Sequence, residues 1–341
     1  MAFNLRASMA TIKDVAREAG VSVATVSRVL NHSPKASKAS VLAVTTAITH
    51  LNYQPNPAAR ALASHHTNTV GVLVGDVSDP FFGTLVKAVD TVAQQNGKNL
   101  LIGNGYHRAE DERKAINLLI NSRCDALVIH SKGLSDQALI DYAQQVKSLV
   151  LINRYIPELA DRCISLNNSK GTYIATEYLI RHGHTHIAYI NSSHDIEDAT
   201  QRLQGYKDAL AAYNIDLNES YIETTEPYIE GGEQAMTNLL SKSLPISAVI
   251  TYNDNMAAGA INILEDNEIK VPDNISVIGF DDGLIARYVR PQLTTVRYPI
   301  YLMAEEATKL ALNLINVNNI HAIPRIFSPT LVRRNSVINK I

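Results

Sequence analysis

Short apolar runs alternate with longer amphipathic stretches over residues 69–341, and this alternation limits the folds open to the chain more than any other feature. Short apolar runs are typical of buried strands, and apolar residues three and four positions apart are typical of helices. Their alternation favours parallel sheets covered by helices on both faces. We expect strands at Val70–Val74, Leu100–Ile102, Ala126–Ile129, Leu149–Ile152, Ile187–Ile190, Ala248–Thr251 and Ser276–Phe280. We expect helices at Phe81–Asn96, Ala109–Ser122, Asp136–Gln145, Lys170–His182, Asp198–Tyr213, Gly232–Ser241, Asn255–Asp266 and Met303–Val317.

A stretch of this length exceeds one comfortable hydrophobic core, which predicts two similar lobes. Ligands of such folds bind at the carboxyl ends of the strands. Polar side chains gather at those ends, and a helix beginning near Ala199 adds Arg202. Carboxylates, amides and an arginine beside aromatic rings suit the vicinal hydroxyls and the ring face of a sugar.

Composition places the chain among globular proteins, with 46% hydrophobic and 19% charged residues. No segment approaches the roughly 20 apolar residues that a membrane span needs. The first eight residues lack the apolar core of a secretory signal. Cys124 and Cys163 are the only cysteines and have no metal-like spacing. These observations favour a reducing cytoplasm over a disulfide framework.

Charge is distributed unevenly along the chain. Residues 1–68 carry seven Lys and Arg against two Asp and Glu, whereas the whole chain has a net charge of −2. A basic N-terminal part, here called the head, on an acidic remainder, the body, is typical of a domain that binds a polyanion. A solvated basic domain without such a partner has the same composition.

The basic head contains two short helices separated by a glycine turn. Thr11 is a helix cap with Asp14 as its acidic partner, and Gly20 permits the turn. Ser22 caps a second helix over Val23–Leu30. This is the helix-turn-helix pattern, whose second helix can lie in the DNA major groove.

A third helix, from Lys38 to Leu51, is expected to close the core of the head with Val41, Leu42, Val44, Ala47, Ile48 and Leu51. A further short helix, Pro57–Ala63, has a suitable cap in Asn56. A helix of that length is marginal in water, so we expect it to form only when something docks against it.

These segments resemble the lactose/galactose repressor family of bacterial transcription regulators. The resemblance in the head rests on Thr11-Ile-Lys-Asp-Val-Ala16, Ala19-Gly-Val-Ser22, Thr25-Val-Ser-Arg-Val-Leu-Asn31 and the spacing from Tyr53 to Leu62. In the body it rests on Asp79-Pro-Phe-Phe82, Tyr252–Ala260, Val277–Asp281 and Pro291–Val296. Further segments, such as Val74–Gly83 and Phe327–Arg334, are closest to the galactose-repressor branch.

The resemblance implies particular roles in the head. Val23, Ala24 and Arg28 would read bases, with Arg28 suited to guanine. The phosphate contacts would come from Ser22, Thr25, Ser27 and Asn31, and Thr11 would also belong to the DNA-binding face. Pro57–Ala63 would be a hinge helix in the minor groove, where Arg60 binds DNA and Leu62 wedges between base pairs.

In the body, the resemblance implies a periplasmic-binding-protein-like fold whose two lobes enclose a small sugar, D-galactose first among the candidates. The implied effector contacts are Asp79, Phe82, Asn153, Arg202, Asn253 and Asp281, together with Tyr298, which stands where some family members have glutamine. Asp254 and Asp282 are equally suited to capping helices.

The expected organisation is an extension over residues 1–8, a helix-turn-helix domain over 9–55, a hinge and linker over 56–68, and a two-lobed body over 69–341. A two-fold operator on double-stranded DNA needs two heads, so we expect a homodimer. Helix Phe81–Asn96 and segment Arg108–Ser122 are interface candidates. The resemblance implies no cofactor, and a cytoplasmic protein that joins the nucleoid when it binds DNA.

Three other interpretations stay open. A family member can use its ligand as a corepressor rather than as an inducer. A sugar-binding transport protein would need a signal peptide and no basic head. A sugar-modifying enzyme would need a nucleophile or an acid/base pair, and no spacing supports one. The motif His182-Gly-His-Thr-His186 suggests zinc, but it lacks a fourth ligand.

Overall fold

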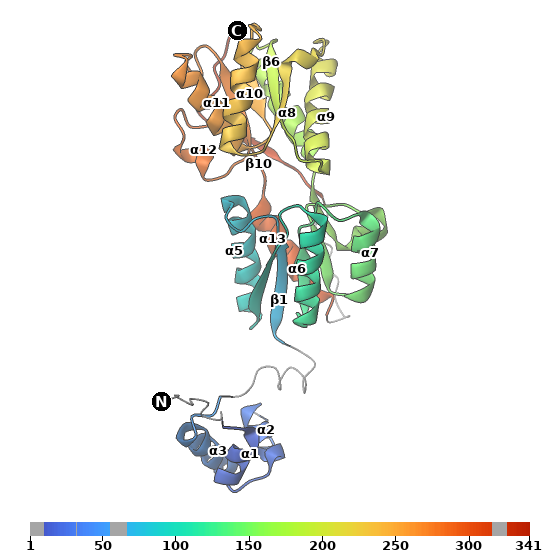
Figure 1. The fold of residues 1–341 in the computed structure, drawn as a ribbon, viewed down its shortest axis with the longest axis vertical. Helices are drawn as coiled ribbons and strands as arrows, with labels where there is room; N and C mark the ends of the chain where they lie inside the picture. The colour runs from blue at the N-terminus through green and yellow to red at the C-terminus, as the bar shows by residue number, and fades with distance from the viewer. Residues whose placement is uncertain (1–9, 32, 55–66, 316–325) are drawn as a thin grey trace, which may run out of the picture. The chain divides into compact units, whose positions relative to one another are not determined.

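The computed structural model describes residues 10–31, 33–54, 67–315 and 326–341. The chain divides into two compact units, Met1–Thr67 and Asn68–Ile341 (Figure 1). The extension at residues 1–8 and the expected helix Pro57–Ala63, with Arg60 and Leu62, lie outside the described residues.

The first unit contains α1 (Ile12–Glu18), α2 (Val23–Leu30) and α3 (Lys38–His50). A hydroxyl side chain caps each helix: Thr11 in a reciprocal capping box with Asp14, then Ser22 and Ser37. Gly20 has a φ of +63°, the left-handed conformation that the turn requires. The two-helix motif therefore forms where the sequence predicts it.

The core of this unit is small and differs from the prediction at α3. Its buried side chains are Val15, Ala16, Val26, Val29, Val44 and Ala47. Val41 and Leu42 were expected to join them, but they are 41% and 72% exposed. Leu42 lies two residues before Val44, about 200° around the helix, and so points away from the core.

The second unit has two lobes, each built on a six-stranded sheet. In the first lobe the strand order is β11-β5-β4-β3-β1-β2, and all of its pairs are parallel. Its strands are β1 (Thr69–Val74), β2 (Asn99–Asn104), β3 (Ala126–Ile129), β4 (Leu149–Ile152), β5 (Cys163–Leu166) and β11 (Ile326–Phe327). Its α-helices are α5 (Pro80–Gln95), α6 (Ala109–Asn121), α7 (Asp136–Gln145) and α13 (Ile300–Asn313).

The second lobe has the strand order β12-β10-β9-β8-β6-β7, in which only β12 is antiparallel to its neighbour. Its strands are β6 (Ile187–Ser192), β7 (Ile222–Thr225), β8 (Ala248–Thr251), β9 (Ser276–Asp281), β10 (Thr294–Arg297) and β12 (Thr330–Val332). Its α-helices are α8 (Asn168–Arg181), α9 (Glu197–Ala212), α10 (Ile229–Ser241), α11 (Asp254–Asp266) and α12 (Ile285–Tyr288).

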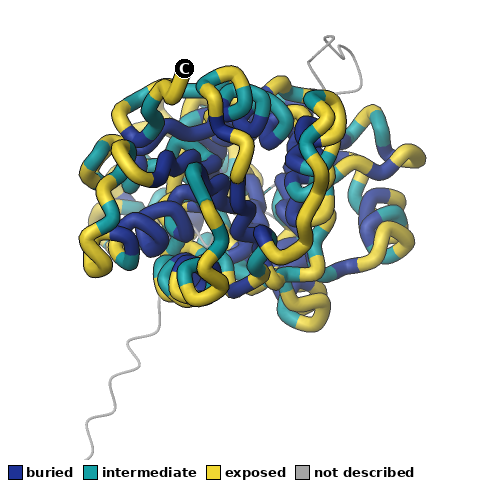
Figure 2. The backbone as a smooth tube through the Cα atoms, turned by 90° about the horizontal axis from the view of Figure 1, so that it is seen from above, coloured by how far each residue is buried: buried dark blue, intermediate teal, exposed yellow. Residues whose placement is uncertain are grey.

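Helices cover both faces of each sheet, as the alternation of apolar runs predicts. In the first lobe, α5 and α13 pack together against one face, and α6 and α7 cover the other. In the second lobe, α8 and α9 form one pair and α10 and α11 the other. The buried positions therefore follow the strands and the inward helix faces (Figure 2).

The chain crosses between the lobes three times: from β5 into α8, from β10 into α13, and from β11 into β12. Neither lobe is therefore a continuous stretch of sequence. The sequence prediction placed seven strands correctly in position but did not include β5, β7, β10, β11 or β12.

Glycine at position 205 lets α8 and α9 pack closely. A Cβ atom at Gly205 would lie 2.0 Å from the backbone oxygen of Ser169, whereas one at Gly83 on α5 would meet nothing within 4 Å. We expect Gly205→Ala to lower the free energy of unfolding by about 1–3 kcal/mol through overpacking. Gly83→Ala should instead raise it by up to about 1 kcal/mol, because alanine favours helices. Chemical denaturation of both variants measures the contrast, and an unchanged Gly205→Ala protein would contradict the packing account.

Candidate functional site

A cavity of about 1020 Å³ in the second unit is lined by residues of both lobes. Its walls come from the loops that follow the strands, at the carboxyl ends where the sequence places a ligand site. All seven predicted effector residues line it: Asp79, Phe82, Asn153, Arg202, Asn253, Asp281 and Tyr298.

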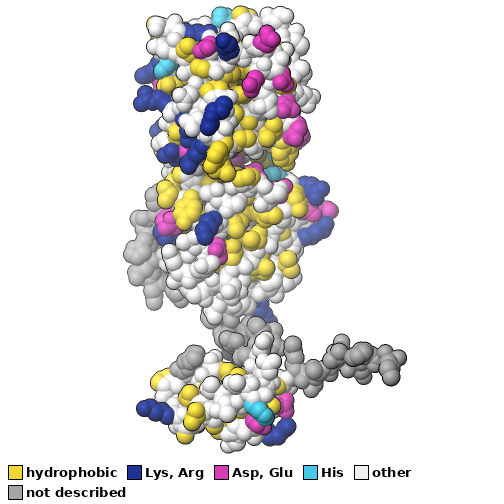
Figure 3. All heavy atoms as spheres, turned by 90° about the vertical axis from the view of Figure 1, so that its left-hand side faces the viewer, with side chains coloured by type: hydrophobic (Ala, Val, Ile, Leu, Met, Phe, Trp, Pro, Cys, Tyr) yellow, Lys and Arg dark blue, Asp and Glu magenta, His cyan; other side chains and the backbone are white. Residues whose placement is uncertain are grey.

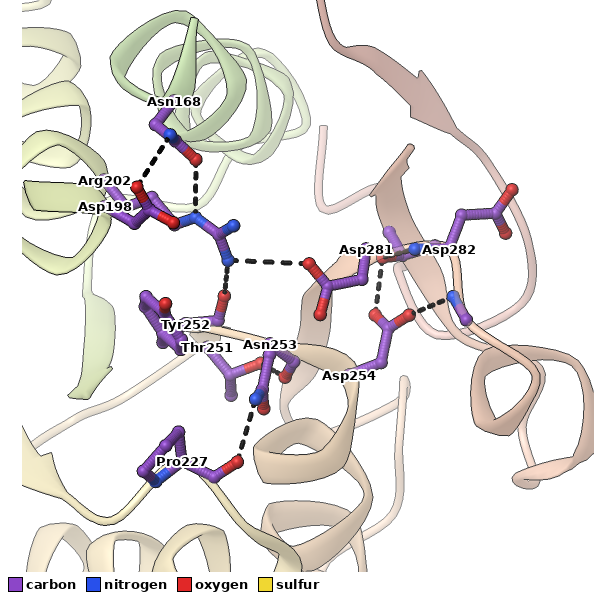
Figure 4. Close-up of polar contacts among 12 residues, drawn as sticks. Asn168, Asp198, Arg202, Pro227, Thr251, Tyr252, Asn253, Asp254, Asp281 and Asp282 are labelled. Carbon is purple, nitrogen blue, oxygen red and sulfur yellow. Dashed lines mark hydrogen bonds and ion pairs between the residues drawn. The ribbon is translucent and has the colours of Figure 1, made fainter. Parts of the chain in front are cut away.

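The Arg202 guanidinium is the fixed polar group of this cavity (Figure 4). Its side chain is 3% exposed and lies over the rings of Tyr252 and Phe280, at 4.5 Å and 3.6 Å. Its Nε donates to Asn168 at 2.9 Å, and its Nη1 donates to the Tyr252 carbonyl at 2.6 Å. These contacts hold the cation in one orientation.

Asp281 faces that cation at the end of β9, with its Oδ1 3.6 Å from the Arg202 Nη1. Burial raises the pKa of the Asp281 carboxyl well above its ordinary value, and Arg202 opposes the rise. The backbone φ is +116° at Asp281 and +56° at Asp282. Backbone strain of this kind clusters at ligand sites, where neighbouring contacts maintain it.

The carboxylates of Asp254 and Asp282 hold in place the loop that follows β9 and begins at Asp281. Asp254, the first residue of α11, accepts hydrogen bonds from the Thr295 hydroxyl at 2.5 Å and the Gly283 amide at 2.8 Å. Burial raises the pKa of Asp254 to about 7. Asp282 is paired with Arg334 and Arg297. Asp254 and Asp282 therefore support the loop with their side chains.

Three predicted contact residues also have structural bonds of their own. The Asn253 side chain caps α11 and donates to the Pro227 carbonyl at 2.9 Å. Asp79 caps α5 by accepting from the Phe81 amide at 2.8 Å. Asn153 donates to a carboxylate of the other lobe. Their orientation is thus set by the protein itself.

An aromatic wall lies on the first-lobe side of the cavity. Phe81 packs edge-on against Tyr298, with ring centroids 5.0 Å apart, and against Phe82 at 5.2 Å. Phe82 packs against the ring of His130 at 5.0 Å. These four rings all line the cavity, so their edge-to-face packing forms an apolar part of its wall.

The sequence interpretation missed several residues that line the cavity, namely His107, His130, Lys132, His194, Asp198 and Tyr252. His130 and Lys132 directly follow β3, so the rule that polar residues gather after strands predicts them once it is applied to every strand. Asp198 lies four residues before Arg202 on α9 and therefore on the same helix face.

The candidate DNA-binding face belongs to the first unit. Val23, Ala24 and Arg28 of α2 are exposed, and Thr25 and Ser27 are partly exposed. The Ser22 and Thr25 hydroxyls lie 2.9 Å apart at the start of the helix. The Asn31 amide lies 3.5 Å from the Ser27 hydroxyl. The outward row of α2 thus presents the predicted base-reading residues together.

The histidine motif has a structural role. His184 is buried, and its ring nitrogens contact the Ser247 hydroxyl and the Ile338 carbonyl, both at 3.1 Å. It joins the C-terminal segment to the second lobe. Over the residues that the structure describes, no group of three or more His, Cys, Asp or Glu side chains can hold a metal ion. None of the helices within the described ranges is long and apolar enough to cross a membrane.

The Asp282 pairs give a direct test of the loop support. Asp282→Ala leaves Arg334 unpaired in a largely buried site, which should cost roughly 3 kcal/mol of unfolding free energy. The exposed Asp273 is the matched control, and Asp273→Ala should change stability by no more than about 0.5 kcal/mol. Equal stabilities of the two variants in urea would show that the pair does not support the loop.

Two known families match the chain. The family described as "Bacterial regulatory proteins, lacI family" matches residues 11–56, and the "Periplasmic binding protein-like domain" matches residues 176–337. Among solved structures, the lac repressor dimer bound to operator and the anti-inducer ONPF has a TM-score of 0.85 at 25% identity, covering 97% of this chain and 100% of that chain. The complex of the transcriptional regulator CelR with cellobiose has a TM-score of 0.70 at 28% identity, covering 96% and 99%.

Curated relatives match almost the full length. The HTH-type transcriptional regulator GalR of Escherichia coli (strain K12) is 57% identical over 329 residues, which are 96% of each chain. The HTH-type transcriptional regulator GalS of Salmonella typhimurium is 54% identical over 333 residues, 96% of this chain and 97% of the relative. The chain belongs to the lacI family of bacterial regulatory proteins.

Proposed function

We propose that this protein is a transcriptional repressor that binds a two-fold operator as a homodimer and is released when a sugar enters the cleft of its body. The observation that carries the proposal is the Arg202–Asp281 pair, held beside aromatic rings in a cavity between two lobes of a chain with a helix-turn-helix head. D-galactose is the proposed effector, because the relatives with the highest identities quoted above are GalR and GalS.

In the head, the exposed row of α2 reads the major groove. Val23, Ala24 and Arg28 contact base edges, and Arg28 suits the O6 and N7 atoms of guanine. Ser22, Thr25, Ser27 and Asn31 contact phosphates and set the register, and Thr11 belongs to the same DNA-binding face. Arg60 and Leu62 act in the minor groove. The domain boundaries proposed are those of the sequence analysis: 9–55 for the head, 56–68 for the hinge and linker, and 69–341 for the body.

In the body, the sugar hydroxyls bond to Asp281, Arg202, Asn253, Asn153 and Asp79. Phe82 and the Phe81–Tyr298 pair pack against the ring. Since the walls belong to different lobes, a bound sugar favours one lobe arrangement over another. The difference in sugar affinity between the two arrangements is the free energy available to weaken operator binding.

Self-association of the body brings two heads to the two half-sites. In the first lobe, β2 is an edge strand, and Ile102 on it and Leu118 on α6 are 41% and 56% exposed. Figure 3 shows hydrophobic side chains gathered on one side of this lobe. We propose that this surface, with α5 and the segment from Arg108 to Ser122, forms the dimer contact. The repressor acts in the cytoplasm, at the nucleoid.

Base reading by Arg28 is tested by Arg28→Ala. Loss of a bidentate contact should reduce discrimination at one operator base pair by about 1–3 kcal/mol. Fluorescence anisotropy with single-base-pair operator variants at fixed salt measures it. Arg17→Ala removes the same charge from α1 and should weaken binding to all sequences about equally, if at all. Full discrimination by the Arg28→Ala protein would refute the assignment.

Sugar binding by Asp281 is tested by Asp281→Asn. A hydrogen bond to a charged group contributes about 1.5–3 kcal/mol, so D-galactose affinity should fall roughly 10–100-fold. Operator affinity should persist. Calorimetry and anisotropy measure the two affinities, and Glu230→Gln, at an exposed position on the cavity rim, is the matched control. Unchanged D-galactose affinity in Asp281→Asn would exclude this residue from the site.

A further inference from the structure

Asp198 belongs to the second lobe, but its carboxylate is bonded mainly by the first. Its Oδ1 lies 2.7 Å from the Lys132 Nζ, and its Oδ2 accepts from the Asn153 amide nitrogen at 2.7 Å. Lys132 follows β3 and Asn153 follows β4, whereas Asp198 is the second residue of α9. The Lys132 and Asp198 side chains are only 2% and 8% exposed. Two buried polar bonds thus cross the boundary between the lobes.

Lys132 is held rigidly within the first lobe. The buried Glu112 carboxylate on α6 accepts hydrogen bonds from the backbone amides of Lys132, Gly133 and Leu134. A Cβ atom at position 133 would lie 2.6 Å from the backbone nitrogen of Ala109, so the loop fits closely against the start of α6. The Lys132 Nζ also donates to the Asn153 carbonyl. Because the backbone at Lys132 is fixed to the first lobe, a displacement of Asp198 beyond the reach of the Lys132 side chain breaks their bond.

The carboxylate at this junction stays charged. Burial acts to raise the pKa of Asp198, but Lys132 and Arg202 together hold that pKa below its ordinary value. A charge-assisted hydrogen bond is shorter than a neutral one and roughly twice as strong. A lobe arrangement that keeps this bond is therefore favoured over one that breaks it.

The same groups face the cavity that the sugar is proposed to enter. Lys132, Asn153 and Asp198 all line it. In this arrangement both Asp198 oxygens and the Asn153 amide are engaged across the boundary. A sugar hydroxyl that bonds to Asn153 competes with the bond between the lobes. A bound sugar and the bonds that cross between the lobes therefore compete for the same side chains.

We propose that Lys132, Asn153 and Asp198 form a latch between the lobes that stabilises the operator-binding arrangement and is opened by the sugar. This inference rests on the proposed function and deepens it, because it names the residues that regulate the response. Lys132 and Asp198 act as positioning residues, and the latch sets how much sugar is needed for release.

The test compares Lys132→Met, Asp198→Asn and the double variant with the wild-type protein. Operator affinity is measured by anisotropy at fixed salt, and D-galactose affinity by calorimetry. Without the latch the equilibrium shifts towards the sugar-binding arrangement. We expect operator affinity to fall and D-galactose affinity to rise, each at least fivefold. The double variant should resemble the single ones, because both residues belong to one contact.

Opposite changes in operator affinity and D-galactose affinity distinguish a latch from a purely structural contact. Loss of a purely structural contact would lower both affinities. Lys98→Met is the matched control: Lys98 pairs with Asp125 at 2.6 Å inside the first lobe, so this variant should lower the Tm without opposite shifts. The double variant removes both buried charges and leaves neither unpaired, so it keeps the test valid if a single variant does not fold.

The remaining outcomes are also decisive. Affinities that fall together, stay unchanged, or shift towards tighter operator and weaker D-galactose binding would each overturn the latch. If the wild-type protein releases its operator but the variants respond identically, the latch alone is wrong. If the wild-type operator complex ignores D-galactose, D-fucose and other sugars, the proposed function fails and the latch fails with it.

Discussion

The buried guanidinium of Arg202 is the interaction around which the body is arranged. A cation in a largely apolar interior is costly unless charge and hydrogen-bond partners surround it. Here Asn168, the Tyr252 carbonyl and Asp281 supply those partners, and two aromatic rings cover its faces. Because the cation needs these partners, the residues after β8 and at the end of β9 are gathered around the guanidinium that α9 supplies. A site for a polar ligand is thus built before any ligand arrives.

The parallel sheets explain why that point lies between the lobes. Every strand of a parallel sheet delivers its following loop to the same edge, so the functional residues of each lobe gather on one side. The three crossings of the chain keep the two edges together. One cluster of buried hydrophobic residues also contains members of both lobes. A ligand that bonds to residues of both lobes is therefore proposed to favour one arrangement of the lobes over another.

The sequence predicts strands that are unbroken apolar runs well and misses strands interrupted by polar residues, even where these are buried, as at Cys163–Leu166. Ala126–Ile129 is an unbroken buried run and was predicted with its observed bounds. By contrast, Ile222–Thr225 is an edge strand with only its last residue buried, and three of its four residues are polar. The seven effector candidates were assigned by their positions in the family that the chain resembles, and all seven line one cavity. Lys132 was missed because the rule that polar residues gather after strands was not applied to β3, and its contact with Asp198, 66 positions away, is seen only in the fold.

The central claim is that one chain couples sugar in the body to operator in the head. Titrating D-galactose into the protein bound to a fluorescent two-fold-symmetric galactose-operon operator, at fixed salt, measures that coupling directly. The account predicts that saturating sugar weakens operator affinity tenfold or more, a coupling free energy of about 1.4 kcal/mol or more. Operator affinity that is unchanged or strengthened by the sugar would contradict it.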